Sequence, residues 1–261
     1  MRDPLKDEAY FMEYLTFQNQ TIAEFEELLE TVIRERGVDD EGVRNGYIAL
    51  SGYHFNRLIA MYSAGGPLDE IRDALPPLIG LFEKTWEPDD PDSLDDYVEL
   101  VWLLSIGIML GIDEALMSRL DRLAQHYAPH DALIDFLLNA RRSVSWKPRQ
   151  ASFVYGYPYN RLLPVIEGEQ SIQRLNVYLE NDWYRGHDGM GWHDSHLHQD
   201  PIYRGYWSFE SGAIMKILVW MTKYSRTSPT IRMTWCIPKT PARRNEACAT
   251  SSKTNATLKI T

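Results

Sequence analysis

Cysteine is scarce in this sequence, because the 261 residues contain only two, Cys236 and Cys248, both close to the C-terminal end. This excludes a disulfide framework and a Cys-x-x-Cys metal site from the rest of the chain. Long apolar runs are also missing: the longest covers about residues 98–110, which is too short to span a bilayer and predicts a buried helix. The first residues, MRDPLKDEAY, show no basic segment followed by an apolar one, so we expect a cytoplasmic protein that does not bind a membrane.

Positive charge is scarce over most of the chain. The sequence has 27 Lys and Arg against 37 Asp and Glu, a formal net charge of −10. Residues 222–261 contain 8 of the basic residues and 1 of the acidic ones, so the preceding residues carry 19 basic and 36 acidic residues, a net charge of −17. Such a charge excludes nucleic acid as a partner and favours a basic protein, whose approach it would accelerate.

Alternation of apolar and polar residues, which is typical of strands, nowhere extends far enough to predict a sheet. Apolar residues instead recur at helical spacing; in the first helix they include Ile22, Leu28 and Leu29. We expect helices over about residues 8–36, 40–64, 67–86, 93–111, 114–127, 130–142, 169–184 and 206–218, with Gly37 ending the first and Pro76-Pro77 interrupting the third. The sequence therefore predicts an all-α fold, a multi-helix bundle of two packed helical domains with an irregular C-terminal tail.

One short stretch, WHDSHLHQD at residues 192–200, concentrates histidine and aspartate. His193, His196 and His198 could supply imidazole ligands to a metal ion, with Asp194 or Asp200 as a fourth ligand. On a helix, His193 and His196 would share a face while His198 would point elsewhere, and the HExxH spacing of zinc hydrolases is absent. Two interpretations stay open from these residues: a metal-dependent hydrolase, or side chains that are hydrogen-bonded or solvated.

Other catalytic patterns are missing from the sequence. Ser195 has an acidic neighbour and a histidine neighbour, but adjacent residues do not face each other in regular structure, and no GxSxG turn surrounds it. The glycines around residue 189 match neither GxGxxG nor a phosphate-binding loop. Acidic residues are too numerous for Glu210 to be singled out as a general acid. We therefore predict no catalytic residue and no cofactor.

The segment from Trp183 to Leu218 resembles the C-terminal signature of the PoNi family, immunity proteins paired with PoNe-type DNase toxins in bacterial antagonism. It reads W-Y-R-G, then W-H-D-S-H, then Y-R-G-Y-W-S-F-E. The stretches YFMEYLTFQNQTIAEFEELL and GVRNGYIALSGYHFNRLIAMYSAG resemble the N-terminal domain of the same family, so that the resemblance covers about residues 3–218. The signature positions are Trp183, Tyr184, Gly186, Trp192, Asp194, Ser195, His196, Tyr203, Gly205, Tyr206, Trp207, Ser208, Phe209 and Glu210.

The resemblance implies an N-terminal helical domain over residues 1–125 and a C-terminal helical domain over residues 126–218. It implies a non-enzymatic inhibitor that binds and neutralises a cognate antibacterial toxin, a DNase. The signature positions would be structural, and Trp192, Asp194, Ser195 and His196 would form a hydrogen-bonded corner of the C-terminal domain. A metal site fits the resemblance poorly, because the family usually has an aromatic residue at the position of His193 and no histidine at that of His198.

An acidic inhibitor could compete with DNA for the basic face of a DNase. The acidic, proline-bearing loop EPDDPDSLDD gives the candidate toxin contacts of this sequence. They are Asp89, Asp90, Asp92, Asp95 and Asp96.

Beyond Leu218 the resemblance ends. The family continues through Asp-Asp towards Tyr-Tyr-Pro-Tyr-Asp-Leu-Val, whereas residues 229–236 of this chain read PTIRMTWC. The codons CCT ACT ATC CGT ATG ACC TGG TGY encode PTIRMTWC, and they encode the family sequence when read from the third base of the first codon. In the same frame, the codons of residues 220–222 give Asp-Asp. We infer that one guanine is lost near Leu218 and that residues 219–261 form a frameshifted, poorly ordered tail.

Overall fold

The structure is a computed structural model of the chain, and it describes residues 1–86, 94–142, 146–149, 151–168 and 170–224. The elements in these ranges are α-helices and short 3-10 or π-helical turns, and none of them is a strand. The all-α prediction is therefore confirmed. The tail predicted to be poorly ordered begins at residue 219, but residues 219–224 form the end of a helix over Phe209–Tyr224, and residues 225–261 lie outside the described residues. Within the described ranges, no helix combines the length and the apolar character that crossing a membrane requires.

The chain forms two compact units that alternate along the sequence. The first unit takes residues from 1–93, 110–123 and 194–205, and the second takes residues from 94–109, 124–193 and 206–261, as far as these ranges are described. Each unit therefore contains segments from both sides of the boundary expected at residues 125 and 126. We retain that boundary as a proposal for how the two sequence domains divide.

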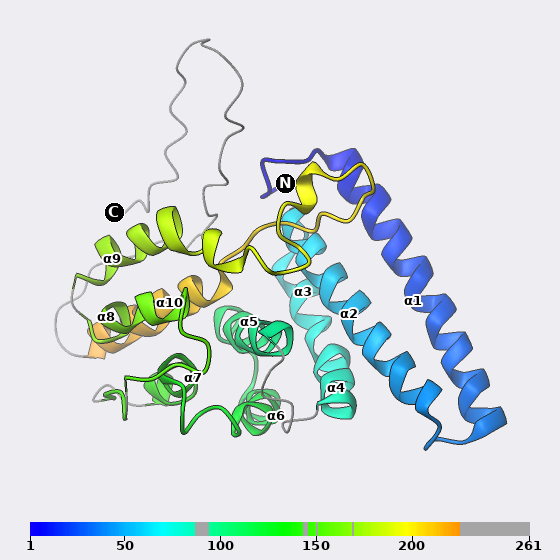
Figure 1. Cartoon of the computed structure of the whole chain (residues 1–261), viewed down its shortest axis with the longest axis horizontal. Helices are drawn as coiled ribbons and strands as arrows, with labels where there is room; N and C mark the ends of the chain where they lie inside the picture. Colours follow the sequence, from blue (N-terminus) through cyan, green and yellow to red (C-terminus); the bar gives the residue numbers. More distant parts are fainter. Residues whose placement is uncertain (87–93, 143–145, 150, 169, 225–261) are drawn as a thin grey trace, which may run out of the picture. The chain divides into compact units, whose positions relative to one another are not determined.

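The first unit is built on a helical hairpin of α1 (Glu8–Arg36) and α2 (Glu41–Ser63), which lie side by side in Figure 1. Asp7 caps α1 by accepting a hydrogen bond from the amide of Tyr10, and Gly37 follows its last residue with a φ of +91° that favours glycine. The helix predicted over residues 8–36 thus has the expected ends. The two helices share a core of Ile22, Leu29, Val43 and Leu50.

The other helices of the first unit are α3 (Leu68–Asp73), α4 (Leu75–Thr85) and α6 (Glu114–Ala124). The interruption expected at Pro76-Pro77 lies instead at Ala74, and both prolines stand in the first turn of α4. Proline is tolerated there because the amides of a first turn have no helical acceptor to lose. Arg119 joins α6 to α4 through two hydrogen bonds to the carboxylate of Glu83, at 3.0 and 2.7 Å.

The second unit contains α5 (Leu94–Leu110), whose residues 97–108 are all buried except Glu99, as the apolar run predicts. Its other elements are α7 (Ala132–Asn139), η1 (Ala140–Arg142), η2 (Tyr159–Leu162), α8 (Leu163–Ile166), α9 (Ser171–Val177), η3 (Tyr178–Asp182), η4 (Arg185–His187) and α10 (Phe209–Tyr224). The Lys216 ammonium of α10 donates to the carbonyls of Ile108 and Met109 at 2.8 and 3.0 Å. These carbonyls belong to the last turn of α5 and have no helical donor, so the lysine fixes α10 against α5.

Candidate functional site

The signature positions are divided between the two compact units. In the second unit lie Trp183, Tyr184, Gly186, Trp192, Tyr206, Trp207, Ser208, Phe209 and Glu210. In the first unit lie Asp194, Ser195, His196, Tyr203 and Gly205, within the loop of residues 194–205. The corner expected of Trp192, Asp194, Ser195 and His196 remains a proposal, and the residues in each unit have surroundings of their own.

In the second unit, the signature aromatics pack against one another in the interior. The rings of Trp183 and Trp192 stack with their centroids 5.4 Å apart. Trp102 of α5 lies 5.5 Å from Trp192 and 5.5 Å from Phe209, again between ring centroids. All four side chains are buried. Burial of such a side chain stabilises a fold by roughly 1.5–3 kcal/mol, so these residues act as core and offer no surface to a ligand.

Glu210 places a carboxyl group inside this core. Its Oε1 accepts hydrogen bonds from the Tyr178 hydroxyl at 3.0 Å and from the Ser208 hydroxyl at 2.7 Å. Burial raises the pKa of the Glu210 carboxyl, against the smaller lowering effect of these hydrogen bonds. The group is inaccessible, which excludes Glu210 as a general acid for an external substrate.

A buried histidine that the sequence does not single out lies next to the signature tryptophans. His187 Nδ1 lies 2.6 Å from the Trp183 carbonyl oxygen, and Nε2 lies 2.9 Å from the Tyr159 hydroxyl. A neutral ring satisfies both contacts if Nδ1 donates to the carbonyl and the hydroxyl donates to Nε2. Burial lowers the pKa of His187 to about 4, so the ring is neutral at neutral pH.

Asp131 is a second buried polar residue of this unit. It caps α7 by accepting a hydrogen bond from the Ile134 amide at 2.9 Å, and it accepts others from the Tyr97 hydroxyl and the Val154 amide, each at 2.9 Å. Burial raises the pKa of its carboxyl group. An aspartate before the apolar run ALIDFLL is a helix-start signal, so the sequence contains a clue to this role. The residue is structural, because all its contacts organise the backbone and one tyrosine.

The three histidines considered as metal ligands have separate environments. The His193 ring belongs to the second unit and lies 4.1 Å from the Tyr184 ring between centroids. His196 and His198 belong to the first unit, where the His196 ring lies 6.2 Å from the Tyr203 ring and His198 is exposed. Across the described part of the chain, no group of three or more His, Cys, Asp or Glu side chains is placed to hold a metal ion. The structure therefore lends the hydrolase alternative no support.

In the first unit, the loop of residues 194–205 binds to the helical hairpin. The Tyr10 hydroxyl donates to the Tyr203 carbonyl and accepts from the Tyr203 amide, both at 2.9 Å. The Tyr203 hydroxyl donates to Asp3 at 2.5 Å, and the Ser63 hydroxyl donates to the Arg204 carbonyl at 2.6 Å. Burial raises the pKa of Asp3, with the hydrogen bond from Tyr203 acting in the opposite direction. These bonds connect residues far apart in the sequence and hold the loop in place.

The acidic loop is described only in part. Asp89, Asp90 and Asp92 lie outside the described residues. Asp95 and Asp96 stand in the first turn of α5, and both are exposed. Carboxylates at this position interact favourably with the helix dipole, so the pair can stabilise α5.

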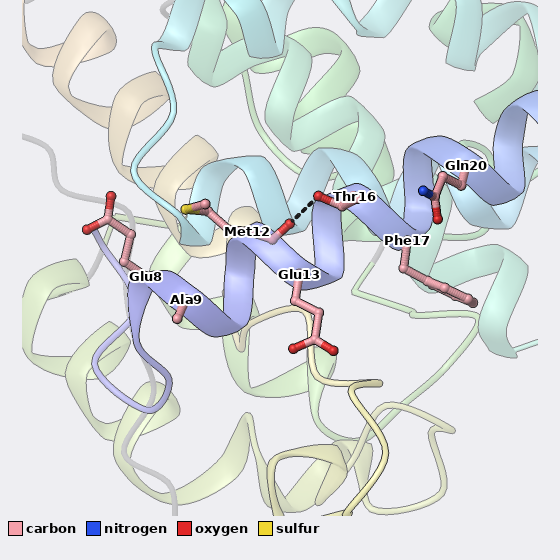
Figure 2. A pocket seen from close by; sticks show the side chains of 7 residues that line it. All are labelled: Glu8, Ala9, Met12, Glu13, Thr16, Phe17 and Gln20. Carbon is pink, nitrogen blue, oxygen red and sulfur yellow. Dashed lines mark hydrogen bonds between the residues drawn. The ribbon is translucent and has the colours of Figure 1, made fainter.

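The outer surface of α1 carries a feature that the sequence does not predict. A shallow, open pocket, shown in Figure 2, is lined by Glu8, Ala9, Met12, Glu13, Thr16, Phe17 and Gln20. Met12 is 65% exposed and Phe17 is 54% exposed. Leu28, which the helical spacing groups with core residues, is also 56% exposed. The number of apolar residues in α1 is the clue to this feature in the sequence, because the side that faces α2 cannot cover all of them.

Comparisons with known proteins are consistent with the sequence resemblance. The family model for the N-terminal domain of PoNe immunity protein (PoNi) matches residues 2–122, and the model for the C-terminal domain matches residues 129–229. No curated protein matches the chain. The crystal structure of protein PA2201 from Pseudomonas aeruginosa is similar with a TM-score of 0.48 and 16% sequence identity, over 79% of this chain and 81% of that one.

Proposed function

This chain belongs to the PoNi family, the immunity proteins of PoNe nuclease toxins, and we propose that it binds and neutralises a cognate toxin without catalysis of its own. The observation that carries the proposal is the match of both family domains over residues 2–122 and 129–229. The toxin proposed is a DNase. The cytoplasm is the proposed site of action, because the DNA that such a toxin attacks lies there.

The charge of the chain supports inhibition by direct binding. Residues 1–221 carry a net charge of −17, and a DNase must present a basic surface to DNA. An acidic protein can therefore cover that surface and accelerate the encounter through its field. The polar side chains of Glu210, His187 and Asp131 are buried, so an external substrate cannot reach them in the folded chain.

The test is inhibition of the neighbouring toxin by the purified chain. The nuclease domain encoded beside this gene is titrated with the protein while cleavage of plasmid DNA is measured. We expect inhibition to be complete near one inhibitor per toxin and to weaken as salt is raised. Cleavage that continues at a tenfold excess of inhibitor, together with cell death on co-expression, would contradict the proposed function.

The acidic loop is proposed as part of the contact surface. Its test is neutralisation of all five aspartates to asparagine, with Asp95→Asn/Asp96→Asn as the smaller variant. The control is Glu167→Gln/Asp188→Asn, a pair of exposed acids elsewhere in the second unit. Slower association in the loop variants, with the control unchanged, supports the loop as a contact. Equal rates in all variants would remove the loop from the interface.

We also propose that the reading frame changes near Leu218. The match to the C-terminal family model continues to residue 229, so it does not end at the position where we propose that the frame changes. Sequencing of the gene tests the proposal. We expect one guanine to be missing from the gene, and we expect a chain translated after its restoration to protect better against the toxin. Close relatives that have an intact reading frame and also encode PTIRMTWC would contradict the proposal.

A further inference from the structure

We infer that the outer face of α1, which carries the exposed side chains of Met12 and Phe17, is a docking surface for the basic face of the cognate toxin. The inference rests on the proposed function and assigns the toxin to residues of the first unit other than those of the acidic loop. The outer face is defined here by the residues that line its shallow pocket, Glu8, Ala9, Met12, Glu13, Thr16, Phe17 and Gln20.

The shape and chemistry of this face fit a protein partner. Figure 2 shows Met12 projecting from one side of the helix, and Glu13 and Phe17 from the other. The Thr16 hydroxyl donates to the Met12 carbonyl at 2.8 Å, so its hydrogen is used within the helix. Methionine and phenylalanine are enriched at the centres of protein interfaces, whereas charged residues surround such centres. Met12 and Phe17 lie on either side of this face and Glu13 projects beside Phe17, so exposed apolar side chains and carboxylates occur together on it.

The negative charge of α1 indicates that the surface of its partner is positively charged. Residues 8–30 contain six glutamates and no lysine, arginine or histidine. All six glutamates are exposed. Basic side chains of the helix first occur in its last turn, at Arg34 and Arg36. A basic surface would be attracted along about six helical turns, whereas a second copy of this chain would bring glutamates against glutamates.

The area of the outer face limits how much of an interface with the toxin it can form. The residues that define the outer face span 13 positions of the helix, a strip about 20 Å long and about 10 Å wide, or on the order of 200 Å². A stable interface covers about 800 Å² on each partner. The outer face of α1 therefore supplies an anchor, and other parts of the acidic surface complete the contact.

The experiment measures binding of the full chain to the inactivated nuclease domain encoded beside its gene. Met12→Ser/Phe17→Ser removes the two exposed apolar side chains of the outer face. Ile48→Ser/Leu68→Ser is the matched control, because Ile48 and Leu68 are large, exposed side chains of α2 and α3. Glu8→Lys/Glu13→Lys reverses charge on the outer face. Its control is Glu41→Lys/Glu70→Lys, since Glu8 and Glu41 each begin a helix and all four glutamates are exposed.

We expect the serine pair on α1 to weaken binding at least tenfold, chiefly through faster dissociation. The lysine pair on α1 should slow association and reduce its dependence on salt. Both controls should bind within about twofold of the unmodified chain, and all variants should keep the helical circular dichroism of the parent, because these side chains are exposed.

The outcomes separate this inference from the proposed function. If the unmodified chain binds and protects while both α1 variants do so equally well, the toxin docks elsewhere and the inference is overturned. If the unmodified chain neither binds nor protects, the proposed function fails and this inference fails with it. If the α1 serine pair turns a dimer into a monomer in sedimentation and leaves toxin binding unchanged, the occupant is a second copy, which also overturns the inference.

Discussion

The hydroxyl of Tyr178 donates a hydrogen bond to the carboxyl group of Glu210 at 3.0 Å, between two side chains that are both buried. The two residues are 32 positions apart in the sequence. Ser208 donates a second hydrogen bond to the same oxygen at 2.7 Å. An acidic residue of the signature thus serves the interior of the second unit and is unavailable to a toxin.

Replacement of Glu210 by glutamine tests the protonation of this group. Burial raises the pKa of Glu210 above its ordinary value of 4.5, so the folded chain holds the proton more tightly than the unfolded chain. The contribution of this bound proton to the free energy of unfolding is fully present below pH 4.5, and it is lost as the pH rises through the pKa of the folded chain. Glu210→Gln keeps the accepting oxygen and cannot ionise, so its stability relative to the parent should rise between pH 5 and pH 8 in urea unfolding. Glu167→Gln, at an exposed site, is the control; a difference that does not vary with pH would contradict the assignment.

His187 should make the second unit sensitive to acid. Burial lowers its pKa from 6.5 to about 4, so the unfolded chain binds a proton more readily and stability falls as the pH drops from about 6.5 towards 4. The shift corresponds to a loss of about 2 kcal/mol between pH 7 and pH 5. His187→Gln should reduce the pH dependence of the unfolding free energy by that amount, whereas His126→Gln, at an exposed site, should not. The same pH dependence in both variants would show that His187 is not the group responsible.

Gly186 is a position where the fold excludes a side chain. A Cβ atom added there would lie 2.5 Å from both Cβ and Cγ of Pro158 and 2.7 Å from its Cδ. The rigid proline ring cannot move aside cheaply, so Gly186→Ala should destabilise the second unit by about 1–3 kcal/mol. A Cβ at Gly189 meets nothing within 4 Å, so Gly189→Ala should change stability by less than about 1 kcal/mol. Thermal unfolding of the two variants measures the contrast, and equal melting temperatures would argue against the close contact.

Tyr10 should hold the loop of residues 194–205 to α1. Tyr10→Phe removes the hydroxyl that both donates to and accepts from the backbone of Tyr203, and should cost about 1–3 kcal/mol. Hydrogen exchange of the Tyr203 amide should accelerate at the same time, because the amide loses its acceptor. Tyr157→Phe is the control, at a tyrosine that is 43% exposed. Unchanged protection of the Tyr203 amide would show that another group holds the loop.

The helices of this fold are largely predictable from the sequence, because helical periodicity is a local property. The helix over residues 8–36 has the expected ends, and the apolar run within residues 98–110 forms the buried helix α5. The prediction that a helix is interrupted at Pro76-Pro77 was wrong by two residues, because the break lies at Ala74. Proline breaks the interior of a helix but is tolerated in its first turn, where both prolines stand. The helix expected from residue 206 begins at Phe209 and continues past Leu218 to Tyr224.

The surroundings of the signature could not be predicted in the same way. Residues 183–210 look continuous in the sequence, yet Asp194–Gly205 belongs to the first unit and the flanking residues belong to the second. The partners of the buried polar groups are distant in the sequence: Tyr10 and Tyr203 are 193 positions apart. Local spacing contains no information about such pairs, because they depend on which elements pack together.

The sequence by itself determined the helical class, the acidic charge of residues 1–221 and the family, because periodicity, composition and signature are all properties of a linear order of residues. Tertiary structure alone decided that Glu210 and His187 are buried, that the three candidate metal ligands have separate environments, and that Met12 and Phe17 face solvent. The physical reason is that burial depends on what covers a side chain. A helix such as α1 with apolar residues on several sides can bury only the side that meets a neighbour, and the identity of that neighbour is set by packing.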